Sequence, residues 1–450
     1  MVYSPSHHPE SAQPWGPKMP SRNPVKRLIA SAKKAQAAHV ERHQATGFQF
    51  AIADRIELLN PGHWDAVTRD ATFFLSRDYL RMFEQHGPRE IAPRYCLIAV
   101  AGRPVAAVAA QMVVLAGGQL VSQHQERGES PSDLKKRQKL VAASKKVLKK
   151  LGRSTLRRVR SRVLVCGNLL SWGAHGVAFA AGEDAARLWP AIAEALYRIR
   201  SAERLFGKTD YVMVKDIPVA LAEGADGLRK YSYRPTKTDP DMVLDIPPAW
   251  KTYNDYLSSL NSRYRKTAKA LDKDVTKAGL RVESLDDMRS EADAIHRLYQ
   301  QVHSHASVRL ATVPAPYLPA LAAAAGVDRF RCTVIRRGQE LVGFVTTLKD
   351  GETAIGYYIG FDYETNATAP LYLRLMQAVI ADAIALDCRR LSLGRTALEP
   401  KARLGAKPQP LTVWTRHRQP LMNLMVRPLL SAIPHNEPPQ RNAFKESQEE

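Results

Sequence analysis

Cysteine is scarce in this chain, and the four cysteines it has are scattered. Cys96, Cys166, Cys332 and Cys388 show no C-x-x-C spacing. Such a distribution excludes a disulfide framework and a zinc-binding signature, and it is typical of a protein in the reducing cytoplasm. We therefore expect a cytoplasmic location, no metal site and no tightly bound cofactor.

The sequence also has no long apolar runs, and it has fewer acidic than basic residues. No apolar segment has the length of a membrane span or the pattern of a secretory signal peptide. Lys and Arg outnumber Asp and Glu by 66 to 44, which gives a formal net charge of +22. That excess favours anionic partners such as nucleic acid, an anionic membrane surface or a phosphate-rich ligand. The 450 residues are 45% hydrophobic, which is enough for the cores of two or three domains.

Both ends of the chain have the composition of disordered segments. Residues 1–46 form a basic stretch rich in Pro, Ser, His and Gln, and residues 435–450 are polar. The apolar stretch Pro420–Pro434 contains prolines and is too short to span a bilayer, so we interpret it as a docking strap or a surface helix.

Positive charge is densest between Asp133 and Arg162, where thirteen Lys and Arg residues accompany one acidic residue. Apolar residues recur there at close to helical spacing, so the first interpretation is an amphipathic helix with a solvated cationic side. The second is an arm that binds phosphates of RNA, lipid or CoA. We expect a basic helical insertion at residues 130–162, with tRNA or an anionic surface as its candidate partner.

Residues 341–396 predict the order strand, turn, strand, loop, helix, strand. Leu341–Lys349 and Thr353–Phe361 are rich in β-forming residues and flank Asp350-Gly351, a dipeptide typical of tight hairpin turns. Apolar residues at helical spacing follow Pro370, and Leu391–Gly394 has the character of another strand.

Residues 162–217 repeat this order of parts: a strand, a glycine-containing turn, an amphipathic helix and a strand. We infer a degenerate internal repeat. It predicts one domain at residues 47–223, a proline-containing crossing segment at 224–248, and a second domain at 249–434.

Three motifs of the C-terminal half carry a family resemblance: YYIGFD, the following helix that opens with PLY, and LSLGRTALEPKARLGAKP. Together with the helix YLSSLNSRYRK they resemble GNAT-type acyltransferases of the BioF2-like and FemAB-like branch. The resemblance implies a mixed α/β fold of two tandem GNAT-like domains, each a twisted mixed sheet flanked by helices. It also implies transfer of an acyl group from acyl-CoA, most simply acetyl-CoA, to an amine of a small molecule or a cell-envelope precursor.

In that superfamily two neighbouring parallel strands splay apart. The resemblance implies that the pantetheine arm of acyl-CoA lies in the gap as a pseudo-strand, with its pyrophosphate at the N-terminus of the next helix. Carried onto this sequence, it assigns CoA contacts to Ile359, Gly360, Asn366, Thr368, Ala369 and Arg395. The chemistry needs a base for the amine, donors for the oxyanion and a proton donor. The candidates are Tyr357 or Tyr358 as proton donor, Asp362, Glu364, His303 or His305 as base, and the 358–360 backbone as oxyanion donor.

Five further residues are candidate substrate contacts. Trp172 and His175 lie between glycines in GNLLSWGAHG, where they either shape a cleft facing the second domain or simply fill a turn and a core. Arg263, Lys401 and Arg403 either bind a phosphate or carboxylate or belong to solvated surfaces.

The loop DYETNATAP departs from the family pattern because it lacks the glycines of the usual acyl-CoA loop. Fewer backbone N–H groups can then surround a pyrophosphate. Two alternatives therefore stay open. One is a FemAB-like transferase that moves an aminoacyl group from tRNA to a peptidoglycan precursor, for which the basic stretch 133–162 would be suited. The other is a non-catalytic binding module with the same fold.

Overall fold

The computed structural model of the chain describes residues 44–116, 160–306, 309–424, 439 and 441–445, together with residues 33, 36 and 40. The chain divides into two compact units, residues 1–45 and 46–450, and the second holds all the elements discussed below. Most of the predicted tails, nearly all of the predicted basic insertion and most of the predicted strap lie outside the described residues. The prediction of a disordered C-terminal tail needs correction at residues 441–445, because Ala443 is buried and Phe444 forms a β-bridge with Leu260.

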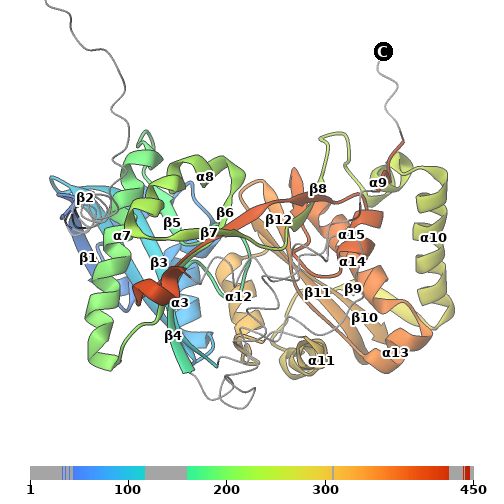
Figure 1. Cartoon of the computed structure of the whole chain (residues 1–450). Coiled ribbons are helices and arrows are strands. Elements are labelled where there is room, and N and C mark those ends of the chain that lie inside the picture. The colour runs from blue at the N-terminus through green and yellow to red at the C-terminus, as the bar shows by residue number, and fades with distance from the viewer. Residues whose placement is uncertain are drawn as a thin grey trace, which may run out of the picture. The chain divides into compact units, whose positions relative to one another are not determined.

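The N-terminal half is built on an eight-stranded sheet (Figure 1). Its strands β1 to β4 pair in sequence as an antiparallel meander, and β4 then pairs parallel with β6. The order across the sheet is β1 (Gln49–Ala53), β2 (Ile91–Val100), β3 (Arg103–Ala116), β4 (Arg160–Cys166), β6 (Tyr211–Pro218), β15 (Leu411–His417) and β7 (Arg234–Lys237), with β5 (Val177–Phe179) paired to β3.

The C-terminal half contains a seven-stranded sheet with the same plan. Four strands form an antiparallel meander, and the fourth pairs parallel with the next. The order is β9 (Leu280–Ser284), β10 (Phe330–Arg337), β11 (Glu340–Asp350), β12 (Thr353–Phe361), β13 (Arg390–Ser392), β8 (Asp241–Asp245) and β14 (Lys407–Gln409). The shared order confirms the predicted mixed α/β fold and agrees with the internal repeat.

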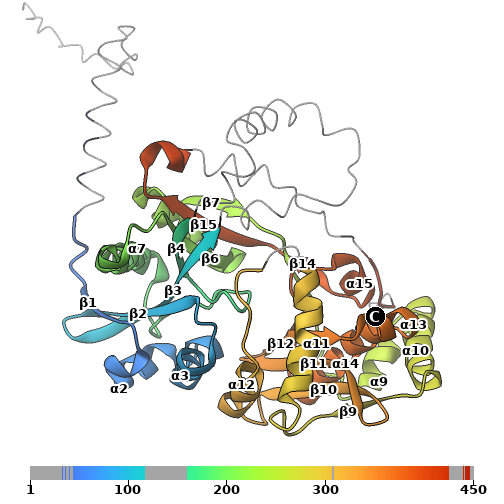
Figure 2. The same ribbon diagram turned by 90° about the horizontal axis from the view of Figure 1, so that it is seen from below.

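The two sheets exchange one strand in each direction. β8 follows β7 in the chain but pairs with β13 and β14 of the C-terminal sheet. β15 follows β14 but lies between β6 and β7 of the N-terminal sheet. Figures 1 and 2 show the chain passing between the halves at both places. A division of the chain at one point therefore cannot separate the two sheets.

Helices flank both sheets. The N-terminal half has α2 (Pro61–Thr68), α3 (Arg77–His86), α7 (Ala185–Ala202), α8 (Val219–Ala225) and short 3-10 helices at Ile56–Leu58, Phe73–Leu75, Glu203–Phe206 and Asp226–Tyr231. The C-terminal half has α9 (Tyr253–Ser259), α10 (Ser262–Lys277), α11 (Ala292–His305), α12 (Tyr317–Ala325), α13 (Tyr363–Thr368), α14 (Leu371–Ala385) and α15 (Leu398–Arg403).

Two helix predictions need correction. The single helix expected across the motif YLSSLNSRYRK is interrupted. Leu260 forms a β-bridge with Phe444, and the Asn261 side chain caps a new helix by accepting from the Tyr264 N–H at 3.3 Å. The loop expected after β12 contains α13, because Asp362 caps it by accepting from the Thr365 N–H at 2.7 Å.

One hydrophobic core is common to both halves. It joins Phe74, Tyr79 and Val165 of the N-terminal half to Tyr317, Phe344 and Tyr357 of the C-terminal half. A chain of phenols runs through it, with 3.3 Å between the hydroxyls of Tyr79 and Tyr317 and 2.9 Å between those of Tyr317 and Tyr357. Two further cores belong to one half each, beneath α7 and beneath α14. The shared core fixes the relation of the residues described next.

Candidate functional site

The parallel pair β12 and β13 separates after three residue pairs. Thr353, Ala354 and Ile355 pair with β13, but β12 continues to Phe361. Beyond Ser392 the chain turns toward β8, because the Leu393 N–H donates to the Met242 carbonyl at 2.8 Å. We call the space between β12 and β13 beyond Ile355 the strand gap. Its vertex is the last pair, Ile355 and Ser392.

A bulge in β12 decides which backbone groups face this gap. The register with β11 shifts between Val345 and Thr347, and the Tyr358 N–H donates to the Thr346 hydroxyl at 3.0 Å. The Asp362 N–H donates to the Val342 carbonyl at 2.9 Å. Because backbone groups alternate along an antiparallel strand, the N–H groups of Ile359 and Phe361 point to the strand gap. Of the predicted 358–360 donors, only Ile359 therefore faces it.

Gly360 has a packing role. A Cβ atom on Gly360 would lie 2.7 Å from backbone atoms of Leu298 and Tyr299, so any side chain here would collide with α11. The glycine lets α11 lie directly against β12. By the same alternation, the Gly360 N–H points toward β11 and away from the strand gap.

The donors predicted to hold a pyrophosphate are largely engaged within the chain. The Asn366 side chain accepts from the Tyr372 N–H at 3.0 Å, and the Thr368 hydroxyl donates to the Thr365 carbonyl at 3.0 Å. The Ala369 N–H donates to the same carbonyl at 2.8 Å, and Ala369 is buried. The Asn366 side chain thus binds a backbone N–H at the N-terminus of α14, the place to which the family resemblance assigns the pyrophosphate.

Aromatic rings connect Tyr358 to His303. The Tyr299 ring lies edge-on to Tyr358 at 5.5 Å between centroids and stacks on His303 at 5.1 Å. Burial, with the charge of Arg309, lowers the pKa of His303, so its imidazole is neutral at pH 7. Burial raises the pKa of Tyr358 well above its ordinary value, so its phenol stays protonated. These are the states that a base and a proton donor require.

The other two predicted bases are less suited to that role. Burial would raise the pKa of Asp362, but hydrogen bonds from Thr365 and Gln301 and the charge of Arg337 lower it. A carboxylate with a lowered pKa is a weak base, and this one caps α13. His305 is exposed, and its Nδ1 lies 2.8 Å from the Gln301 carbonyl oxygen while its ring lies against Tyr363.

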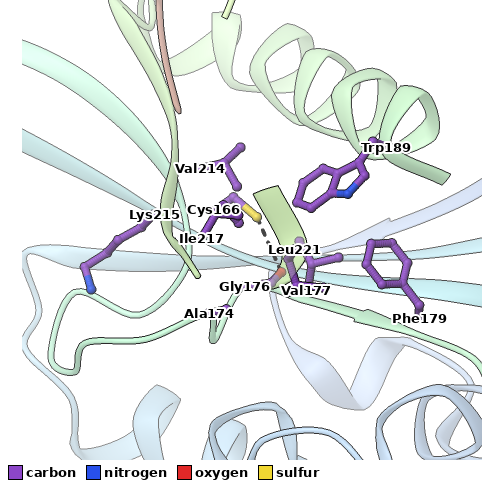
Figure 3. A pocket seen from close by; sticks show the side chains of 10 residues that line it. All are labelled: Cys166, Ala174, Gly176, Val177, Phe179, Trp189, Val214, Lys215, Ile217 and Leu221. Atoms are coloured by element: carbon purple, nitrogen blue, oxygen red, sulfur yellow. Dashed lines mark hydrogen bonds between the residues drawn. The ribbon is translucent and has the colours of Figure 1, made fainter. Parts of the chain in front are cut away.

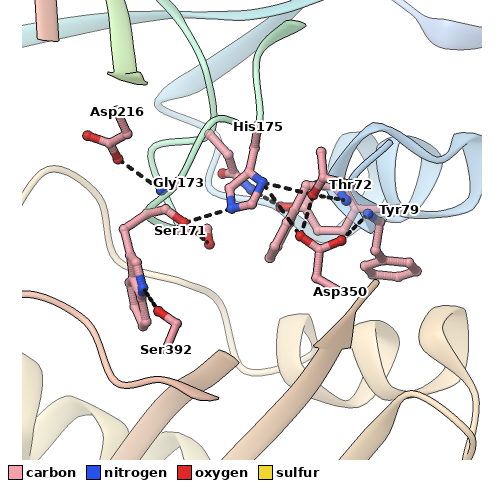
Figure 4. Close-up of polar contacts among 12 residues, drawn as sticks. Thr72, Tyr79, Ser171, Gly173, His175, Asp216, Asp350 and Ser392 are labelled. Atoms are coloured by element: carbon pink, nitrogen blue, oxygen red, sulfur yellow. Dashed lines mark hydrogen bonds and ion pairs between the residues drawn. The ribbon is translucent and has the colours of Figure 1, made fainter. Parts of the chain in front are cut away.

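Trp172 and His175 of the N-terminal half reach the C-terminal half. Figure 4 shows His175 beside Asp350. The Trp172 Nε1–H donates to the Ser392 hydroxyl at 2.5 Å, beside the vertex of the strand gap. The Ser392 hydroxyl in turn donates to Asp241 at 2.6 Å. His175 Nε2 lies 2.7 Å from the Trp172 carbonyl oxygen, and its Nδ1 lies 2.8 Å from the Thr72 hydroxyl. Both predicted residues thus lie where the halves meet.

Arg395 forms an ion pair with Asp216, which is fully buried and also pairs with Lys215. Burial would raise the pKa of Asp216, but the two cations lower it, so the carboxylate is charged. The Gly173 N–H donates to the same carboxylate at 3.1 Å. Arg395, predicted to contact CoA, therefore binds a carboxylate of the other half.

Lys401 is buried, with 4% of its surface exposed, close enough to Asp241 for their charges to interact. Burial lowers the pKa of Lys401 to about 8, against the opposing effect of Asp241. Burial also raises the pKa of Asp241, which accepts from Ser392 and from the Gly394 N–H at 2.9 Å. The sequence did not single out Asp241 or Ser392, because their meeting depends on the strand exchange.

The two remaining predicted cations lie on the surface. Arg263 is exposed on α10, and Arg403 pairs with Glu399 one helical turn away at 3.0 Å. This is the arrangement expected of solvated helix faces. We find no geometric reason to group them with Trp172, Ser392 and Lys401.

A cavity in the N-terminal half lies where β4 ends beside β6 (Figure 3). It corresponds in the repeat to the place where β12 leaves β13. Apolar side chains, among them Phe179, Trp189 and Leu221, line it together with Lys215, and Cys166 donates to the Gly176 carbonyl there.

Comparison with known proteins gives one family match. The sequence model described as an acetyltransferase (GNAT) domain matches residues 262–402. The match covers the strand gap, Tyr358, His303 and Lys401, so the predicted kinship with GNAT-type acyltransferases, and with it the transferase class, is confirmed.

A curated relative from Mycobacterium tuberculosis, named 8-amino-7-oxononanoate synthase 2, is 25% identical over 287 residues. The alignment covers 62% of this chain and 36% of the relative, so the chain spans about a third of its length. Two solved structures are also similar. FemX shares 8% identity at a TM-score of 0.47 and covers 84% of this chain and 99% of its own. A tandem GNAT protein from the clavulanic acid biosynthesis pathway shares 11% sequence identity at a TM-score of 0.45. The match covers 83% of this chain and 99% of that protein.

In the part of the chain that the structure describes, no helix combines the length and apolar character that a membrane crossing requires. The same residues contain no group of three His, Cys, Asp or Glu side chains placed to hold a metal ion. All four cysteines are buried and unpaired. The cytoplasmic location stays a prediction.

Proposed function

We propose that the GNAT domain transfers a short acyl group from an acyl-CoA thioester to an amine of a small molecule or a cell-envelope precursor. The strand gap is the observation that carries this proposal. The N–H groups of Ile359 and Phe361 are left without a strand partner, and unpaired strand edges recruit extended amide-bearing ligands. A pantetheine arm, which contains two amides, is such a ligand.

The residues around the gap suit the chemistry of aminolysis. Neutral His303 takes a proton from the incoming ammonium group, and the amine nitrogen then bonds to the thioester carbon. The Ile359 N–H donates to the oxyanion that forms. The carbon–sulfur bond breaks and the departing thiolate takes the proton of Tyr358. The attacking nitrogen gives up its second proton, which restores the phenol through solvent, and His303 releases its proton to solvent. Tyr299, in contact with both rings, positions His303 relative to Tyr358.

Aminoacyl-tRNA is the alternative donor of the transferred group. It is favoured because groups at the N-terminus of α14 already bond within the chain. Asn366 and Thr368 already bond within the chain, and Asp362 and Glu364 add negative charge to the same loop. Both features weaken binding of a CoA pyrophosphate. The formal net charge of +22 would in turn favour tRNA, with the basic stretch 133–162 as its candidate site.

The two donors can be separated by one assay. Purified protein is incubated with an amine panel and either acetyl-CoA or a mixture of aminoacyl-tRNAs, and product amides are detected by mass spectrometry. We expect acetylated amine and a matching amount of free CoA thiol. Tyr358→Phe should lower turnover by about a hundredfold, because the leaving thiolate loses its proton donor. Tyr363→Phe, which alters a tyrosine outside the gap, should leave turnover unchanged.

Aminoacyl transfer without acetyl transfer would show that the donor is aminoacyl-tRNA and not acyl-CoA. No transfer from either donor with any amine would favour a non-catalytic binding module. Equal turnover by Tyr358→Phe and Tyr363→Phe would remove Tyr358 from the chemistry.

A further inference from the structure

The segment Ser171–His175, which we call the tryptophan loop, contacts the C-terminal half beside the vertex of the strand gap. Its indole donates to Ser392, the last β13 residue to pair with β12. A Cβ atom on Gly394 would lie 3.1 Å from the Trp172 ring, so this ring also packs on the chain just beyond β13. A side chain of one half therefore closes one end of the gap in the other.

Four contacts hold the tryptophan loop, one after another along its backbone and side chain. Lys215 donates to the Ser171 carbonyl at 2.6 Å, and His175 lies 2.7 Å from the Trp172 carbonyl oxygen. Asp216 accepts from the Gly173 N–H at 3.1 Å. The indole contact with Ser392 is the fourth. A bulky ring supported in this way acts as a fixed wall, since movement would break several buried hydrogen bonds together.

The direction in which acyl-CoA lies in the strand gap determines which part of it contacts the Trp172 ring. Under the proposed function, on which this inference rests, the pantetheine arm enters past Phe361 and its thioester reaches the Ile359 N–H. The acyl chain then extends along β12 toward the vertex. Beyond Ile355 that direction leads to Ser392 and the Trp172 ring.

We propose that Trp172 sets the length of the acyl group, and that the chain is built for acyl groups of two or three carbons. Its ring occupies the space into which further methylenes of a longer chain would extend. The Ser392 hydroxyl supplies one of the four contacts that hold the tryptophan loop, and it need not touch the acyl group. Specificity for the donor thus resides in the half that does not carry the GNAT domain match.

The test measures kcat/KM for acetyl-, butyryl- and octanoyl-CoA in wild type, Trp172→Ala, Trp172→Phe and Ser392→Ala. We expect the butyryl-to-acetyl ratio to rise about tenfold in Trp172→Ala, since each buried methylene is worth about a fourfold gain. Trp172→Phe keeps a ring, and Ser392→Ala removes only the hydrogen bond, so both should retain the wild-type ratio to within about threefold. Trp172→Leu, with an intermediate rise, serves if Trp172→Ala does not fold.

A second readout does not depend on turnover or on the nucleotide. Binding of acetyl and butyryl thioesters of N-acetylcysteamine is followed by ligand-observed NMR in the same variants. An unchanged chain-length preference in Trp172→Ala and Trp172→Leu, in both readouts, would overturn the role of Trp172 while the proposed function stands. If the wild-type protein turns over no CoA ester, the proposed function fails. The binding of the N-acetylcysteamine thioesters then decides by itself whether Trp172 limits the length of the acyl group.

Discussion

The carboxylate of Asp350, at the tip of the β11–β12 hairpin, accepts a hydrogen bond from the Thr72 hydroxyl of the other half at 2.7 Å. The same carboxylate accepts from the Phe73 N–H at 2.7 Å. The predicted turn residue of the C-terminal half is thus a contact between the halves. Asp350 also lies 3.8 Å from His175, which supports the tryptophan loop.

Replacing Asp350 tests how much this contact stabilises the protein. Asp350→Ala leaves the Phe73 N–H and the Thr72 hydroxyl without this acceptor, and we expect the free energy of unfolding to fall by about 1–3 kcal/mol. Chemical denaturation of the full chain measures it. Asp328→Ala, at an exposed aspartate of the same half, should change stability by less than about 0.5 kcal/mol. Equal effects of the two substitutions would contradict a structural role for Asp350.

Lys401 should lower stability at neutral pH. Its pKa falls from 10.5 to about 8 in the fold, so the folded protein binds fewer protons than the unfolded chain between these values. Stability from this group therefore rises with pH between about 8 and 10.5, and the cost of burying the charge is fully present below 8. We expect Lys401→Met to be more stable than wild type at pH 7, by about 1–3 kcal/mol.

The pH dependence of that difference is the sharper measurement. The advantage of Lys401→Met in denaturant titrations should shrink as pH rises from 8 to 10. Lys401→Arg keeps a charge that cannot be discharged, so it should be less stable than wild type throughout this range. An advantage of Lys401→Met that is constant with pH would show that Lys401 does not titrate in this range.

His303 and His305 should differ as bases, because only His303 is connected by Tyr299 to Tyr358. We expect His303→Gln to lower kcat/KM by about a hundredfold or more, and His305→Gln to change it by less than about threefold. In wild type, kcat/KM should fall as pH drops below 6.5, through the lowered pKa of His303. If that acidic limb persists in His303→Gln, the base is another group.

Local patterns predicted the elements of the site but not its assembly. The hairpin turn at Asp350-Gly351, the helix after Pro370 and the repeated order of parts follow from turn chemistry and helical spacing, and the structure bears them out. The exchange of β8 and β15 was not predictable, because an extended segment carries no mark of the sheet it will join. Contacts that depend on it, such as Ser392 with Asp241, were therefore missed.

Three residues predicted to contact CoA have partners within the chain. Arg395 was expected beside CoA, but a buried carboxylate 179 positions earlier in the chain, Asp216, binds it. Asn366 and Thr368 cap and brace their own loop. Trp172 and His175 could be singled out by the glycines around them, whereas their partners lie in distant elements.

The most direct test of the central claim is a thermal shift of the full chain with acetyl-CoA and with bulk tRNA, at low and moderate salt. If the strand gap binds a pantetheine arm, acetyl-CoA at a hundred times its Kd stabilises the protein by about 2.7 kcal/mol, an upward shift of a few degrees that persists as salt rises. Ile359→Pro, which removes one of the two N–H groups that face the gap, should abolish the shift. Stabilisation by tRNA alone, fading steeply with salt, or an acetyl-CoA shift that survives in Ile359→Pro, would contradict the account.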